Sequence, residues 1–202
     1  MDNEITIIVV VEYDLSGIKP VTYELLNAAR KLADNGKIIA LYFTDVENVD
    51  ESPLTHYGAD EIRICIHPAY HQYTHETYAA GLQSEIEKIQ PDIVLMPASN
   101  SGKELSAAVA TRLGVVLASD CIELQSSEEG EVTIKRPVFP GKAFSMCKLT
   151  GPKPYLITLR PNCFRGEGAD ESRTSKTTKI KISLPDFLYP KISREVGNEL
   201  DI

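Results

Sequence analysis

Residues 91–113 read PDIVLMPASNSGKELSAAVATRL, and this stretch decides the fold class of the chain. Residues 93–96 form a short apolar run without alternation, which is typical of a strand covered on both faces. A small polar loop follows at residues 97–102, and an amphipathic helix then opens at Lys103 and Glu104. A buried strand that leads through a short loop into a helix is the unit of a parallel sheet flanked by helices.

The same alternation of strand and helix runs upstream of this stretch. Apolar and β-branched runs predict strands at residues 5–11, 37–43, 61–66 and 92–96. Helical spacing of apolar residues predicts helices at 20–34, 49–57 and 74–90, and another after residue 103. Strands that alternate with helices pair in parallel through right-handed crossovers. We therefore expect a three-layer α/β/α sandwich with a mainly parallel sheet, like the adenine-nucleotide hydrolase fold.

The pattern changes after Val115. Short strands are expected at residues 121–125, 132–135, 143–149 and 154–159. The alternation in EVTIK favours an antiparallel hairpin with one exposed face, so the sandwich should carry a C-terminal antiparallel portion. Residues 165–179 are rich in Gly, Ser, Thr and charge, which predicts a mobile linker. The predicted organisation is one α/β domain over residues 1–165, with a linker and C-terminal extension over 166–202.

Composition excludes several classes of protein. The 202 residues carry a formal net charge of -8, which argues against a broad nucleic-acid surface. No apolar run approaches the roughly 20 residues of a membrane helix, so we expect no membrane insertion. The acidic N-terminus lacks the basic region of a signal peptide, which favours a cytoplasmic location. The four cysteines are widely spaced, and we expect them to be reduced rather than joined in a disulfide framework.

The polar loop after residue 97 is the leading candidate for a functional site. Its members are Ser99, Asn100, Ser101, Gly102 and Lys103. Open α/β sheets bind ligands at the carboxyl ends of their strands, and the first turn of a helix offers unpaired N–H groups to an anion or a carbonyl. The loop is not a phosphate-binding P-loop, because Pro97 takes the first glycine position and Glu104 replaces the magnesium-binding Ser or Thr. A ligand or interface loop and a plain strand-to-helix connection both stay open.

Histidines and aspartates offer weaker candidates. His67, His71 and His75 have the spacing of a metal site on a helix, but the proline after His67 indicates that this stretch opens a helix. We therefore favour a solvated, polar helix start and predict no metal site. Three aspartates each follow an apolar strand, where ribose ligands bind, although turn and cap roles are commoner there: Asp14, Asp45 and Asp120. No G-x-S-x-G elbow is present, and we predict no catalytic residue.

Several segments together resemble the N-terminal domain of the electron transfer flavoprotein alpha subunit. The first strand ends in Val11-Glu12, and LLNAARKLADNGKIIAL follows at residues 25–41. The resemblance continues through YGADEIRI at 57–64 and the quoted stretch at 91–114. It ends with the Asp120-Cys121 step, KRPVFPGKAF at 135–144 and ITLRPNCF at 157–164. Order and spacing agree over residues 5–165.

The resemblance implies a heterodimer with a beta subunit. Such heterodimers hold FAD and pass electrons from dehydrogenases, typically the acyl-CoA dehydrogenases of fatty acid β-oxidation, to an acceptor. Most FAD contacts in the family come from a second, C-terminal domain, whose signatures this sequence lacks. We therefore expect an electron carrier component rather than an enzyme: a scaffold and docking domain that binds no cofactor alone. The expected beta-subunit interface comprises Arg136, Pro137, Gly141, Lys142, Arg160 and Phe164.

Two other functions remain open on the residues alone. One is a stand-alone adenine-nucleotide-binding module with AMP or ATP at residues 99–103. The other, weaker, is a small-molecule enzyme that acts through Cys121 or the histidines. The Arg-Pro steps at Arg136 and Arg160 fit either an anion ligand or an interface, because arginine at a strand end can hold a carboxylate or a phosphate in two-point contact.

Overall fold

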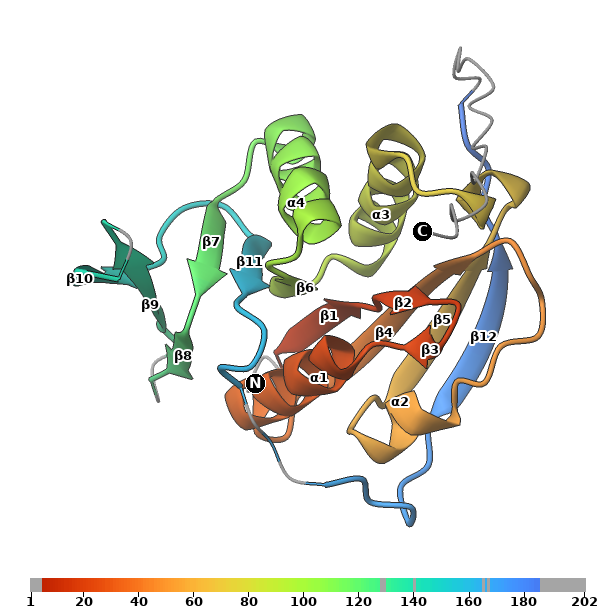
Figure 1. Cartoon of the computed structure of the whole chain (residues 1–202), viewed down its shortest axis with the longest axis horizontal. Coiled ribbons are helices and arrows are strands. Elements are labelled where there is room, and N and C mark those ends of the chain that lie inside the picture. The colour runs from red at the N-terminus through yellow and green to blue at the C-terminus, as the bar shows by residue number, and fades with distance from the viewer. Residues whose placement is uncertain (1–4, 128–129, 140, 165, 167, 186–202) are drawn as a thin grey trace, which may run out of the picture.

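A seven-stranded parallel sheet forms the centre of the protein, in the order β12-β5-β4-β1-β6-β11-β7 (Figure 1). The computed structural model describes residues 5–127, 130–139, 141–164, 166 and 168–185. Within them, neighbouring strands of this sheet pair in parallel throughout. The strands are β1 (Thr6–Val10), β4 (Lys37–Thr44), β5 (Glu61–Ile66), β6 (Ile93–Pro97), β7 (Leu117–Cys121), β11 (Tyr155–Leu159) and β12 (Lys176–Lys181).

Helices cover both faces of this sheet (Figure 1). On one face lie α1 (Pro20–Ala33) and α2 (Ser52–His56); on the other lie α3 (His75–Ile89) and α4 (Asn100–Leu113). The short 3₁₀ helix η1 (Pro68–His71) precedes α3. Proline occupies the first turn of α1, where its missing N–H costs nothing. Gly114 ends α4 in the left-handed conformation, with φ of 65°, which glycine adopts without strain.

The two faces of β1 belong to two separate hydrophobic cores. Ile7 and Val9 pack in the cluster that contains the α1 leucines, whereas Ile8 and Val10 pack in the cluster of α3 and α4. Successive side chains of a strand point to opposite faces, so a strand buried on both sides must be apolar at every position. This constraint explains why β1 and β6 are continuous apolar runs.

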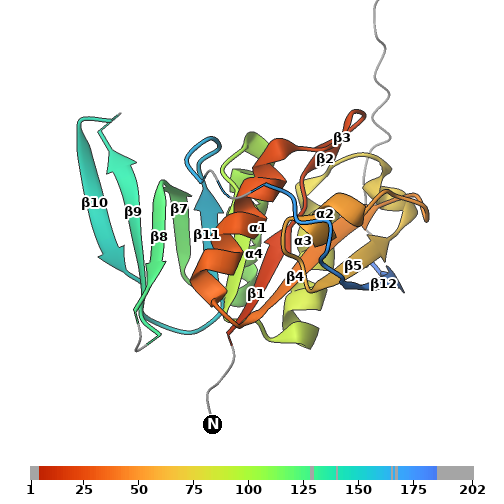
Figure 2. The ribbon, with the colours of Figure 1, turned by 90° about the horizontal axis from the view of Figure 1, so that it is seen from below.

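Antiparallel strands extend the molecule at its β7 edge. A three-stranded sheet of β8 (Glu123–Ser126), β9 (Val132–Val138) and β10 (Ala143–Lys148) runs in the order β10-β9-β8. It projects away from the helices beside β7 (Figures 1 and 2). A second, very short hairpin of β2 (Tyr13–Asp14) and β3 (Gly17–Ile18) follows β1. The predicted sandwich and its antiparallel portion are therefore confirmed.

Three details differ from the sequence-based expectation. The strand expected at residues 121–125 is two strands, because β7 ends at Cys121 in the parallel sheet and β8 starts in the antiparallel one. The strand expected at 154–159 is β11, which inserts in parallel between β6 and β7. The linker predicted over residues 165–179 is wrong at its last four residues, because Lys176–Lys181 forms β12 beside β5. Its polar composition suits an edge strand, which buries few side chains. The rest of the division into domain and extension stays a prediction, and residues 186–202 lie outside the described residues.

All four cysteines carry free thiols. Cys65 and Cys121 are buried, Cys147 is half-buried and Cys163 is exposed. Burial raises the pKa of the Cys65 and Cys121 thiols to about 12, so both are protonated at neutral pH. Over the described part of the chain, no helix combines the length and the apolar character that a bilayer crossing requires.

The packing of α1 on the sheet predicts the effect of a core truncation. Leu25 is fully buried, so Leu25→Ala should lower the free energy of unfolding by about 2 to 5 kcal/mol through lost apolar burial and a residual cavity. Leu15→Ala is the matched control, because Leu15 is fully exposed. Its effect should stay within about 0.5 kcal/mol. Urea denaturation of both variants measures the difference, and equal losses would contradict the packing described here.

Candidate functional site

A pocket opens at the point where the strand order of the parallel sheet reverses. The chain passes from β1 through α1 to β4 on one side, whereas β6 lies on the other side of β1. Loops that leave β1 and β6 therefore diverge at their carboxyl ends, and ligands of open α/β sheets bind in such crevices. The switch-point pocket, as we call it, has a volume of about 580 Å³ and is lined by residues that follow β1, β4 and β6.

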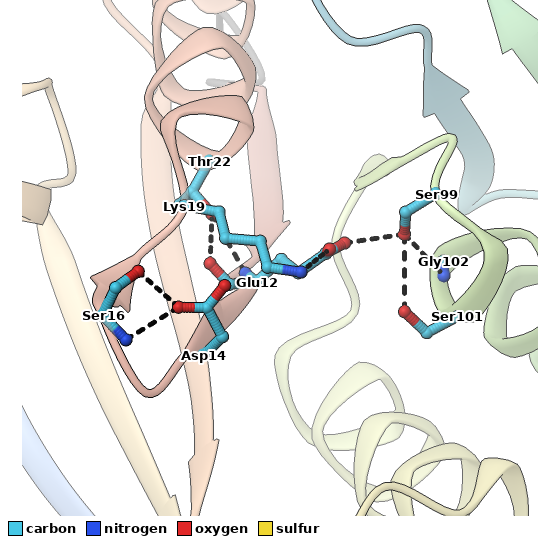
Figure 3. Close-up of polar contacts among 8 residues, drawn as sticks. All are labelled: Glu12, Asp14, Ser16, Lys19, Thr22, Ser99, Ser101 and Gly102. Atoms are coloured by element: carbon cyan, nitrogen blue, oxygen red, sulfur yellow. Dashed lines mark hydrogen bonds and ion pairs between the residues drawn. The ribbon is translucent and has the colours of Figure 1, made fainter. Parts of the chain in front are cut away.

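Glu12 ties the two sides of this switch point together (Figure 3). Ser99 Oγ donates a hydrogen bond of 2.7 Å to Glu12 Oε2, and Lys19 Nζ donates one of 2.8 Å to Glu12 Oε1. Ser99 also caps α4, because its Oγ accepts a 3.1 Å hydrogen bond from the Gly102 N–H. The result is a polar link from the end of β1 to the start of α4.

The backbone on either side of this link is fixed as well. Thr22 in α1 accepts from the Glu12 N–H and donates to the Glu12 carbonyl, both at 3.0 Å. A Cβ on Gly102 would lie 2.0 Å from the Pro97 carbonyl oxygen, so only glycine allows this close approach. Sequence reasoning identified the loop but missed Glu12 as its partner, 87 residues upstream.

Residues of the predicted loop take different places. Ser101 and Gly102 line the pocket, and Ser99 is tied to Glu12. Asn100 and Lys103 are exposed and lie outside the lining. The Glu12 carboxylate lies at the start of α4, where it complements the positive end of the helix dipole. A phosphate bound at the same place would meet that negative charge, which weighs against AMP or ATP at residues 99–103.

Tyrosines form much of the pocket wall. Tyr70 and Tyr78 contact edge to face with ring centroids 4.9 Å apart, and Tyr73 lies 5.0 Å from Tyr78. Tyr73 donates a 3.0 Å hydrogen bond to the Ser101 carbonyl, which joins this wall to α4. Burial raises the pKa of Tyr70, Tyr73 and Tyr78 well above that of free tyrosine, so all three stay neutral. Sequence reasoning weighed the histidines of this segment and missed the tyrosines between them, whose repeated aromatic rings were the available signal.

The histidines have separate partners. His71 Nδ1 lies 2.8 Å from Asp45 Oδ2, and His75 lies within 3.4 Å of Glu104. His67 caps η1 by accepting from the Ala69 N–H. Among the described residues, no group of three or more His, Cys, Asp or Glu side chains could hold a metal ion.

Arg160 directly follows β11 and forms an ion pair with Asp120 of the neighbouring strand β7. Its Nε and Nη2 donate to the two carboxylate oxygens of Asp120, at 3.0 and 2.6 Å. These bonds hold the pKa of the Asp120 carboxyl below its usual range. Phe164 packs against the α1 side of the core, and its N–H donates to Glu24. Two of the predicted interface residues thus make contacts within this chain.

The remaining predicted interface residues lie on the three-stranded sheet or in the turn between β9 and β10. Arg136 and Pro137 belong to β9, and Gly141 and Lys142 to the turn before β10. An apolar patch that includes Pro137 lies on the same two strands and the turn between them. We define it as Pro137, Phe139, Phe144 and Met146 and call it the hairpin patch.

Three large side chains of this patch are mostly exposed. Phe139 is 76% exposed, Phe144 55% and Met146 62%. Phe144 pairs in register with Pro137, and Met146 with Lys135, whose Nζ lies 5.0 Å from the Phe144 ring centroid. Clustered exposed apolar side chains of this kind mark interaction surfaces.

Comparison with known proteins identifies the family of this chain. The profile of the electron transfer flavoprotein domain matches residues 7–185. The chain belongs to the electron transfer flavoprotein family. This confirms the resemblance inferred from the sequence motifs, and the matched range includes β12, which the sequence analysis had placed in a linker.

Curated relatives of this chain carry several names. The chain is 32% identical to the electron transfer flavoprotein subunit alpha of Bacillus subtilis, over 92% of this chain and 57% of the relative. It is 31% identical to protein FixB of Azorhizobium caulinodans, over 76% and 43%. It is 33% identical to subunit LctC of the lactate dehydrogenase (NAD(+),ferredoxin) of Acetobacterium woodii, over 78% and 38%. The chain thus spans about half the length of the curated relatives it matches.

The Glu12–Ser99 link predicts a specific loss of stability. Ser99→Ala removes both the cap of α4 and the hydrogen bond to Glu12, so the free energy of unfolding should fall by about 1 to 2 kcal/mol. Ser101→Ala is the matched control, because its hydroxyl makes only a 3.4 Å contact with Ser99. Chemical denaturation measures both. Equal effects of the two substitutions would contradict the link.

Proposed function

We propose that this chain is the N-terminal domain of an electron transfer flavoprotein alpha subunit and acts as a scaffold and docking domain. It pairs with a beta subunit in a heterodimer that carries FAD and accepts electrons from dehydrogenases, such as acyl-CoA dehydrogenases. The profile match over residues 7–185 and the longer alpha-subunit relatives support this assignment. In such a protein the flavin supplies the redox chemistry, and the polypeptide supplies placement and electrostatics.

The switch-point pocket does not fit the diphosphate of FAD. The switch-point pocket carries the carboxylates of Glu12, Asp14 and Asp45. Lys19 is the one lysine or arginine in its lining, and it is already paired with Glu12. The N-terminus of α4 faces a carboxylate instead of an open anion site. We therefore propose that FAD is held by residues outside this chain and that no electron-transfer step runs through this pocket.

The hairpin patch carries the docking proposal. The three-stranded sheet that carries it projects beside β7 (Figure 2), so a partner can reach this sheet without disturbing the parallel one. Its Phe and Met side chains are residue types enriched at the centres of protein interfaces. Lys135 lies over the Phe144 ring and Lys142 lies in the turn before β10, so both supply basic groups beside the patch, although the whole chain has a net charge of -8. We propose that the beta subunit binds here.

Arg160 and Phe164 stay predictions as interface residues. Their contacts with Asp120 and the core favour a structural role, in which they hold the end of β11 and the following segment in place. Pro137 belongs to the hairpin patch, Arg136 precedes it on β9, and Gly141 and Lys142 lie in the turn before β10. We retain these four predicted residues in the proposed interface.

Complex formation with a cognate beta subunit tests the proposal. On size-exclusion chromatography, an equimolar mixture should elute as one heterodimer. Phe144→Ser should weaken the affinity by about tenfold or more, because exposed aromatic anchors dominate interface energies. Leu15→Ser is the control, since it removes an exposed apolar side chain between β2 and β3, outside the hairpin patch. If the chain fails to pair under conditions in which a full-length alpha subunit pairs, the proposed docking role is contradicted.

Flavin retention by the isolated chain is a separate prediction. The purified chain should be colourless, because its described residues offer no fitting site for the FAD diphosphate. An absorbance spectrum between 350 and 500 nm, roughly the range of flavin bands, measures this after reconstitution with excess FAD and desalting. The assembled heterodimer serves as the positive control. Stoichiometric yellow colour in the chain alone would contradict the proposal.

A further inference from the structure

The switch-point pocket is a binding site that the proposed function leaves unused. Its volume of about 580 Å³ lies within the range of small-molecule pockets, about 300 to 1,000 Å³. Its wall combines three valines and two leucines with four tyrosines, one from β2 and three from residues 70–78: Tyr13, Tyr70, Tyr73 and Tyr78. A flat, largely apolar ligand is therefore the shape that this wall favours.

The charged side chains of the pocket wall indicate which charge a ligand should carry. Glu12, Asp14 and Asp45 line the pocket, against the single ammonium group of Lys19. Lys19 is neutralised by its 2.8 Å contact with Glu12. Counting only the carboxylate and ammonium groups, the described lining has three negative charges and one positive charge, a formal net charge of -2. Low-dielectric walls strengthen the resulting negative potential inside a cleft.

The aromatic rings of the wall also favour a positively charged ligand. The face of a tyrosine ring carries partial negative charge and attracts a cation held close to it. Tyr73 and Tyr78 are fixed near one another by ring contact, and Tyr73 is anchored to Ser101. The rings are therefore positioned before any ligand arrives, which lowers the entropy lost on binding.

Other ligand classes fit these residues poorly. A bare metal ion lacks a ligand set among the described residues. Phosphates and carboxylates would face the acidic lining, and the start of α4 already contacts the Glu12 carboxylate. We propose that the switch-point pocket binds an aromatic organic cation, a flat ring that carries a protonated amine or amidine. This inference is independent of the proposed role in electron transfer.

Three probe molecules separate shape from charge. Benzamidine, benzamide and benzoate share one flat ring and are cationic, neutral and anionic at neutral pH. In titrations of the chain followed by ligand-observed NMR, benzamidine should bind at least about tenfold more tightly than either of the others. AMP is a fourth probe, which tests the alternative of a nucleotide site. Equal binding of the three probes, preference for benzoate, or tighter binding of AMP would overturn the proposal.

Two charge-removing variants locate the site. Asp45→Asn should weaken benzamidine binding by about fivefold or more, because the carboxylate lines the pocket. Asp170→Asn is the matched control, since it removes the same charge from an exposed loop outside the lining and should change the affinity less than about twofold. Glu12→Gln removes a second carboxylate charge from the pocket and also leaves Lys19 without its ion-pair partner, so it should weaken benzamidine binding as well.

Thermal unfolding of each variant checks that it is folded before binding is compared. Equal effects of Asp45→Asn and Asp170→Asn would place the cation elsewhere on this acidic protein and overturn the assignment to the pocket. Loss of binding in both Asp45→Asn and Glu12→Gln, with the control unchanged, supports it.

Discussion

The hydrogen bond between Ser99 and Glu12 joins the two halves of the parallel sheet where its strand order reverses. At that point the loops after β1 and β6 lead away from each other, and covalent connectivity alone does not hold them together. Glu12 bridges the gap because one of its oxygens accepts from Ser99 and the other from Lys19. The start of α4 and the end of β1 are thereby tied to one carboxylate at the mouth of the pocket.

The same carboxylate determines which chemistry the switch point supports. Helix N-termini at this place in α/β sheets commonly receive a phosphate, since their N–H groups and dipole favour an anion. In this chain the negative charge is supplied from within, and two further aspartates border the pocket. An acidic, tyrosine-lined pocket excludes phosphates and favours a cation. The fold is therefore compatible with a flavoprotein subunit whose flavin-binding groups lie in other parts of the complex.

The partner surface follows from a different constraint. A parallel sheet covered by helices on both faces offers few exposed apolar groups, so the hairpin patch stands out on the strands that project beyond β7. Phe139, Phe144 and Met146 do not contribute to either core of the sandwich. Their exposure in the isolated chain is explained most simply by a partner that covers them, which is the role proposed for the beta subunit.

Sequence alone determined the layers, because doubly buried strands must be continuously apolar and helices must carry an apolar stripe. The strands β1 and β6 and the helix α1 meet these rules, and their bounds agree with the expected ones within a residue or two. The motifs also determined the family. Tertiary structure decided where β11 and β12 pair, since pairing partners in a parallel sheet are set by contacts distant in sequence. It also brought Glu12 to Ser99 and the tyrosines to one wall, because these groups are close only after the strands are ordered.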